Sequence, residues 1–152
     1  MSATIKGLKE TEREWIEQAI VRAMMLVRSY RIAGDHPKLT PAVLDQTYAA
    51  WLAHPLADME ATGVFNALGV AFGQYLVDHA GMRWVVYAKE GQTDIAAYRA
   101  SGKVVVFPTH VIRKRYPNRS TNFLAPMYSD MVKSLSMAAK PEPKSPWWKF
   151  GG

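Results

Sequence analysis

A chain of 152 residues, of which 49% are hydrophobic and 21% charged, has the size and composition of one globular domain and not of a disordered segment. The complete absence of cysteine excludes disulfides, thiolate nucleophiles and cysteine-ligated zinc. There is no apolar stretch typical of a secretion signal near the N-terminus and no run of about 18 apolar residues, so we expect a cytoplasmic protein without a transmembrane segment.

The net charge of +6 is unevenly distributed along the chain. Residues 1–80 carry 7 Lys and Arg against 9 Asp and Glu, a net charge of −2, whereas residues 81–139 carry 9 against 3, a net charge of +6. Such asymmetry is compatible with an acidic partner, nucleic acid or a membrane surface. A solvated basic face is the simpler interpretation, because no nucleic-acid-binding motif accompanies the charge.

Apolar residues recur at helical spacing over about residues 12–32, from Pro41 to His54, and over about residues 59–80. Capping and breaking residues mark the boundaries of the first two helices: a capping box at Thr11 and Glu14, a stop at Gly34, an N-cap at Thr40 and a break at His54-Pro55. The third helix is apolar over more than half of its circumference, so we expect it to be buried on more than one side.

Gly69 and Gly73 lie inside this third helix. Each weakens the helix by about 1 kcal/mol relative to alanine. We therefore expect another element to approach the helix backbone closely at these two positions. The spacing is not a dinucleotide fingerprint, which needs three glycines directly after a strand.

Three segments with the two-residue period of strands follow, at Trp84–Tyr87, Asp94–Tyr98 and Lys103–Phe107. Short glycine-containing turns join them, and connections of this length require antiparallel neighbours. The sequence therefore predicts a three-stranded antiparallel meander.

A short helical piece at about 109–116, broken by Pro117, and a last helix at about 122–139 complete the predicted domain. Pro126 must lie in the first turn of the last helix, because an interior proline would break it. We thus expect an α+β domain over residues 1–139, in which the meander is packed with about five helices. Residues 140–152 form a proline-rich, basic and aromatic tail.

Catalytic and cofactor motifs are missing from the sequence. There is no H-E-x-x-H or G-x-S-x-G, and Gly102-Lys103 lacks the Ser or Thr that a phosphate loop places after its lysine. The four histidines include no i, i+4 pair that a helix could present to a metal. We predict no metal site, no cofactor and no catalytic residue, which leaves enzymatic activity open but favours its absence.

Two groups of residues are candidates for binding. Polar groups of a pocket between helix and sheet would be Gln74, Asp78, Arg83 and Asp94. Partner-binding residues would be the basic cluster Arg113, Lys114, Arg115 and Arg119 and the tail aromatics Trp147, Trp148 and Phe150, since aromatic side chains and arginine are common at interfaces.

A set of packing motifs runs from Asn66 to about Leu135: Leu68-Gly69-Val70-Ala71-Phe72-Gly73-Gln74-Tyr75-Leu76, Arg83-Trp84-Val85-Val86, Ala96, Val105-Val106-Phe107-Pro108 and the basic Arg113-Lys114-Arg115. With these motifs the segment resembles a bacterial family defined only as a domain of unknown function, DUF3806. The resemblance implies a small bacterial cytoplasmic α+β domain. It implies no particular reaction and no active site.

We expect a non-enzymatic protein-binding module, in its sharpest form an immunity or inhibitor protein that neutralises a bacterial toxin or effector. One alternative is a nucleic-acid-binding domain that uses the basic cluster at 113–119. Another is a small-molecule-binding domain or enzyme with a pocket between helix and sheet. The oligomeric state is not predicted.

Overall fold

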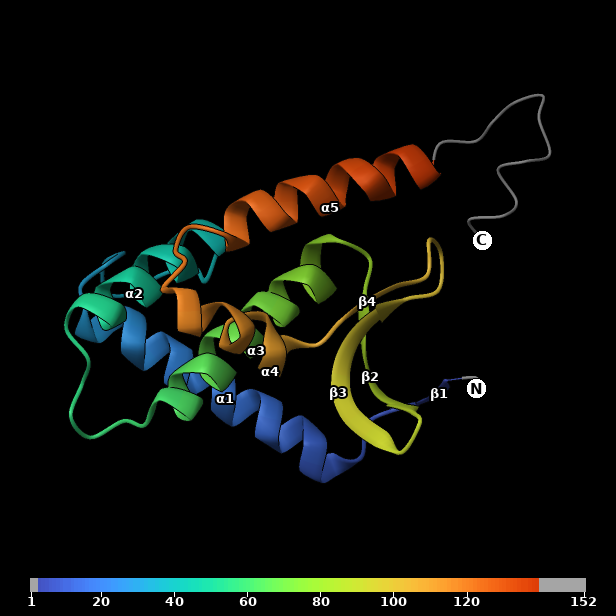
Figure 1. The fold of residues 1–152 in the computed structure, drawn as a ribbon, viewed down its shortest axis with the longest axis horizontal. Helices are drawn as coiled ribbons and strands as arrows, with labels where there is room; N and C mark the ends of the chain where they lie inside the picture. The colour runs from blue at the N-terminus through green and yellow to red at the C-terminus, as the bar shows by residue number, and fades with distance from the viewer. Residues whose placement is uncertain (1–2, 140–152) are drawn as a thin grey trace.

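The computed structural model describes residues 3–139, with side chains to residue 135. Its elements in chain order are β1 (Thr4–Lys6), α1 (Glu10–Ser29), α2 (Pro41–Ala53), α3 (Ala61–His79), β2 (Arg83–Lys89), β3 (Gln92–Arg99), β4 (Val104–Val106), α4 (Pro108–Val111), the 3₁₀ helix η1 (Arg113–Asn118) and α5 (Leu124–Ala139). The four strands form one antiparallel sheet in the order β1-β2-β3-β4. Helices α1 to α4 lie on one side of this curved sheet, and α5 runs across the top of the molecule (Figure 1).

The α+β class and the meander of β2, β3 and β4 are confirmed, but the sheet has a fourth strand that the sequence did not predict. Strand β1 pairs with the free edge of β2, with Ile5 opposite Tyr87. It has only three residues, too few to show a two-residue period. Its conformation depends on pairing with a strand about 80 residues away in sequence.

Both predicted boundaries of the first helix are wrong. Helix α1 begins after Lys9, whose backbone N–H donates to the Glu12 carboxylate over 2.6 Å, so Thr11 lies within the first turn. At its other end, Arg31 takes the left-handed conformation (φ +53°). The Arg31 N–H donates to the Arg28 carbonyl oxygen, and the Ile32 N–H donates to the Val27 carbonyl oxygen. These two hydrogen bonds form the Schellman pattern. The helix therefore stops before it reaches Gly34.

The other helix signals have mixed outcomes. Thr40 caps α2 as predicted, because its hydroxyl oxygen accepts from the Val43 N–H over 3.2 Å. Pro126 lies in the first turn of α5, also as predicted. Pro117, in contrast, does not break the helical piece after β4, since it lies within η1. A 3₁₀ turn tolerates it, and the piece ends at Arg119 in the left-handed conformation.

The two glycines of α3 are sites of close packing, as predicted. A Cβ atom on Gly69 would overlap the carbonyl oxygen of Pro108 and lie 2.9 Å from its carbonyl carbon. A Cβ atom on Gly73 would lie 2.5 Å from Cη2 of Trp84. The missing side chains let α4 and β2 approach α3 directly, which compensates for the low helix propensity of glycine.

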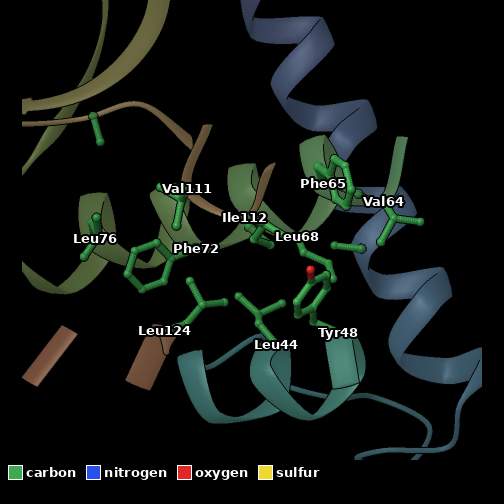
Figure 2. Close-up of a cluster of buried hydrophobic side chains, with 14 of the residues drawn as sticks. Leu44, Tyr48, Val64, Phe65, Leu68, Phe72, Leu76, Val111, Ile112 and Leu124 are labelled. Carbon is green, nitrogen blue, oxygen red and sulfur yellow. The ribbon is translucent and has the colours of Figure 1, made fainter. Parts of the chain in front are cut away.

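Helix α3 is the centre of the hydrophobic core. Figure 2 shows Leu44 and Tyr48 of α2 directed towards Leu68 and Phe72 of α3, and Leu124 of α5 joins the same cluster. On its other side α3 contributes Val70 to a smaller cluster with Ile16 and Ala19 of α1. Burial on several sides explains why α3 is apolar around most of its circumference.

Candidate functional site

The structure does not bring the four predicted pocket residues together. Trp84 points towards α3, where its indole N–H donates to the Gln74 side-chain oxygen over 2.8 Å. Because side chains alternate along a strand, the adjacent Arg83 points away from α3. Tyr87 lies four residues after Arg83 in β2 and therefore on the same face of the sheet as Arg83. Asp94 pairs with Tyr87, so the Asp94 side chain lies on that face as well. Gln74 and Asp78 therefore share one hollow, and Asp94 lies in another.

The first hollow, here called the Asp78 groove, lies between α1, the segment before α2, and α3. It has a volume of about 490 Å³ and is lined by Ile20, Lys38, Leu39, Thr40, Ala71, Gln74, Tyr75, Asp78 and His79. The Gln74 amide donates to Asp78 Oδ1 over 2.9 Å while its oxygen accepts from Trp84. These two hydrogen bonds connect the Asp78 carboxylate to Trp84 of the sheet and thereby orient it.

An aromatic wall closes one side of the Asp78 groove. The Tyr75 ring lies 4.2 Å from the His79 ring and 5.0 Å from the Tyr128 ring, measured between centroids. Burial raises the pKa of Tyr128, and the neighbouring Tyr75 adds to this effect. Contacts on both sides hold Tyr75 in place, so the groove has a preformed wall.

The second hollow, the Asp94 recess, lies at the hairpin end of β2 and β3. It has a volume of about 340 Å³ and is lined by Tyr87, Lys89, Gln92, Asp94, Phe107 and His110. Asp94 Oδ2 and His110 Nε2 are 3.9 Å apart, and the side chains are 33% and 49% exposed. This distance is too long for a hydrogen bond, and both side chains are partly exposed to solvent, so the contact is weak.

The basic cluster is divided between two roles. Arg115 donates to the Val111 carbonyl oxygen over 2.8 Å and covers the Phe123 ring, with its Cζ atom 4.6 Å from the centroid. Arg119 lies over the Tyr116 ring at 4.5 Å. Arg113 and Lys114 are exposed. Two of the four cations thus stabilise an aromatic cluster, because guanidinium groups stack well on ring faces.

Lys114 also lines a third hollow, the β4–α5 groove, which the sequence did not predict. It has a volume of about 390 Å³ and is lined by Val105, Val106, Phe107, His110, Val111, Lys114, Met127 and Met131. The i, i+4 spacing of Met127 and Met131 showed that they share a helix face, but not that this face would lie beside β4. The groove is apolar apart from His110 and Lys114.

A fourth hollow, with a volume of about 720 Å³, is lined by Arg28, Arg31, Gly34, Asp35 and His36. It lies on the connection after α1, and most of these residues are exposed. Arg28 is already bound to the Asp35 carbonyl oxygen over 2.9 Å. Its size reflects an irregular loop surface, and we do not regard it as a functional site.

Three further predictions concern the tail, metal binding and membrane-spanning helices. The tail aromatics Trp147, Trp148 and Phe150 lie outside the described residues. Within residues 3–139, no group of three or more histidine and acidic side chains is arranged to hold a metal ion. None of the helices in that range combines the length and hydropathy needed to cross a membrane.

These elements define a small α+β domain in which a central glycine-bearing helix packs against an antiparallel sheet. The chain belongs to the family described as "Domain of unknown function (DUF3806)", whose profile matches residues 44–128. The matched region runs from α2 to the first turns of α5 and includes Gly69, Gly73 and the basic residues.

A crystal structure of a protein from Bacteroides thetaiotaomicron VPI-5482 has a similar fold. It is 12% identical in sequence and superposes with a TM-score of 0.63, over 91% of this chain and 47% of that one. The present chain therefore spans about half the length of that protein, and the similarity concerns the fold alone. No curated protein sequence matches this chain.

Proposed function

We propose that this protein is a protein-binding module and that the β4–α5 groove is its docking surface. The observation that carries the proposal is an apolar groove formed by Val105, Val106, Met127 and Met131 and also lined by the exposed Lys114. An apolar centre beside a polar rim is the usual arrangement of a protein interface.

The chemistry of the groove favours a partner segment with an apolar anchor and acidic flanking residues. Burying a leucine or phenylalanine side chain contributes about 1.5–3 kcal/mol. Methionine side chains adapt to different anchor shapes because they are unbranched and polarizable. The exposed Lys114, and the net charge of +6 over residues 81–139, favour an acidic approach surface.

Within this proposal the partner is a bacterial toxin or effector, and the protein acts in the bacterial cytoplasm as an inhibitor or immunity protein. The small size of the domain, the absence of catalytic motifs and the absence of cysteine support this form of the proposal. The tail aromatics Trp147, Trp148 and Phe150 would extend the contact surface.

Nucleic-acid binding by the basic cluster has less support, because Arg115 and Arg119 are directed to the rings of Phe123 and Tyr116. The two proposals differ in their salt dependence. Binding through several phosphate contacts weakens steeply as salt increases. Binding through an apolar groove depends only moderately on salt, since only the charge of Lys114 is screened.

The test is affinity capture with matched baits from bacterial lysate that is split into a nuclease-treated half and an untreated half. Met131→Asp places a charge in the β4–α5 groove, and Val21→Asp places one on an exposed apolar position of α1, where Val21 is 59% exposed. The expected result is one stoichiometric protein that is captured by the wild type and by Val21→Asp but lost with Met131→Asp. Circular dichroism of both variants establishes that they are folded.

A second pair of variants tests the charge contribution with the captured partner. Lys114→Glu should weaken binding of the purified partner at least tenfold, about 1.4 kcal/mol, whereas Arg22→Glu on α1 should not. Retention of the partner by both Met131→Asp and Lys114→Glu would contradict the assignment of the groove. Loss of all captured material after nuclease treatment would favour the nucleic-acid alternative.

A further inference from the structure

We infer that the Asp78 groove binds a small zwitterion, with an anionic carboxylate at Lys38 and an amino group at Asp78. The inference uses none of the residues that carry the proposed docking surface, and it concerns a different hollow of the molecule.

The first argument is that opposite charges from two separate segments line one groove. Lys38 precedes α2, and Asp78 belongs to the last turn of α3. Neither has an ion-pair partner within 4.0 Å among the described side chains. Two opposite charges that line one hollow without pairing with each other suit a ligand that carries both charges, with its negative group at the lysine and its positive group at the aspartate.

The second argument is that both charges have the wrong sign for the helix ends beside them. A helix is stabilised by negative groups at its N-terminus and by positive groups at its C-terminus. Here Lys38 lies just before the N-terminus of the 13-residue α2, and Asp78 lies at the C-terminus of the 19-residue α3. Each helix end therefore reinforces its charged residue in attracting the matching end of a zwitterion. Charges that oppose local stability are expected at functional sites.

The third argument is preorganisation of the groove. Trp84 fixes Gln74, and Gln74 in turn fixes Asp78 Oδ1, which leaves the other carboxylate oxygen for a ligand. Tyr75 is held between His79 and Tyr128. A site that is already ordered loses less conformational entropy on binding. The volume of about 490 Å³ lies within the range of small-molecule sites.

The experiment is a titration of the isotope-labelled full chain, followed by amide chemical shifts, with a series of linear ω-amino carboxylic acids of increasing length. Each is paired with the amine that lacks the carboxylate and with the acid that lacks the amine. The expected result is that one length shifts the amides of residues 38–40 and 75–79. Its two single-charge analogues should bind at least tenfold more weakly, because each loses one of the two charge contacts.

Variants separate this inference from a general charge effect and from the proposed function. Asp78→Asn and Lys38→Met should each weaken binding at least tenfold, whereas Asp58→Asn and Lys133→Met, which change exposed charges outside the groove, should not. Met131→Asp should bind the zwitterion like the wild type. The inference is overturned if no member of the series shifts these amides at about 10 mM, if the single-charge analogues bind equally well, or if Asp78→Asn binds normally.

Discussion

Replacement of Asp45 by alanine should destabilise the protein strongly, because this residue of α2 caps the N-terminus of another helix, α5. Asp45 is 4% exposed, and its two carboxylate oxygens accept from the backbone N–H groups of Leu124 and Ala125 over 2.8 and 2.9 Å. Those are the first two residues of α5. The third, Pro126, has no N–H, and the N–H of Met127 bonds to the Phe123 carbonyl oxygen over 3.0 Å. Asp45 therefore satisfies both remaining donors of the first turn of α5.

The magnitude follows from these two bonds. A hydrogen bond to a charged group contributes about 1.5–3 kcal/mol, and loss of a helix N-cap costs about 0.5–2 kcal/mol. Removing the buried carboxylate also removes its desolvation penalty, which offsets part of the loss. We expect Asp45→Ala to lower the free energy of unfolding by about 3 kcal/mol. Asp45→Asn should lose roughly half of that, because an amide oxygen can accept one of the two N–H groups.

Urea denaturation followed by circular dichroism measures this effect. With a slope of about 2 kcal/mol/M, the midpoint of Asp45→Ala should fall by about 1.5 M without a change in slope. The matched control is Asp58→Ala in the exposed connection between α2 and α3, which should change stability by less than about 0.5 kcal/mol. A loss below about 1 kcal/mol for Asp45→Ala, or equal losses for the two variants, would refute the reasoning.

Three other outcomes are expected. Gly69→Ala should abolish cooperative thermal unfolding, because the added Cβ meets the Pro108 backbone, whereas Gly7→Ala, which has nothing within 4 Å, should unfold like the wild type. Burial raises the pKa of Tyr48 above 10.0 in the folded state, so its contribution to stability is complete below that pH and declines as pH rises through the folded-state pKa. As pH rises above 10.0, the urea midpoint should fall less steeply for Tyr48→Phe than for the wild type. An identical dependence of the midpoint on pH in the two proteins would contradict the prediction. Deletion of residues 141–152 should weaken partner capture, and unchanged affinity by calorimetry would remove the tail from the proposed interface.

Features that depend on neighbouring residues in sequence were predictable. The period of the apolar residues, the cap at Thr40 and the turns of the meander are local, so they identified α2, α3 and three of the four strands. The low propensity of Gly69 and Gly73 correctly indicated a close approach, because an unfavourable local choice needs a compensating contact. The resemblance to DUF3806 rested on these same packing residues.

The candidate sites were predictable only where one element carried them. Gln74 and Asp78 line the same hollow because i, i+4 residues share a helix face. The prediction that Arg83 and Asp94 share this hollow is wrong, because their side chains lie on the face of the sheet opposite to Trp84. Lys38 was not recognised as part of the Asp78 groove, because it comes from an irregular segment with no periodic signal.

The sequence by itself determined the helices, the meander, the charge asymmetry and the absence of cysteine chemistry, because each depends on composition or on residues a few positions apart. The tertiary structure decided the pairing of β1, the capping of α5 by Asp45, the division of the basic cluster and the lining of all the grooves. Each of these requires groups from separate elements to meet. Such meetings are set by the packing of α3 against its neighbours and leave no periodic trace in the chain.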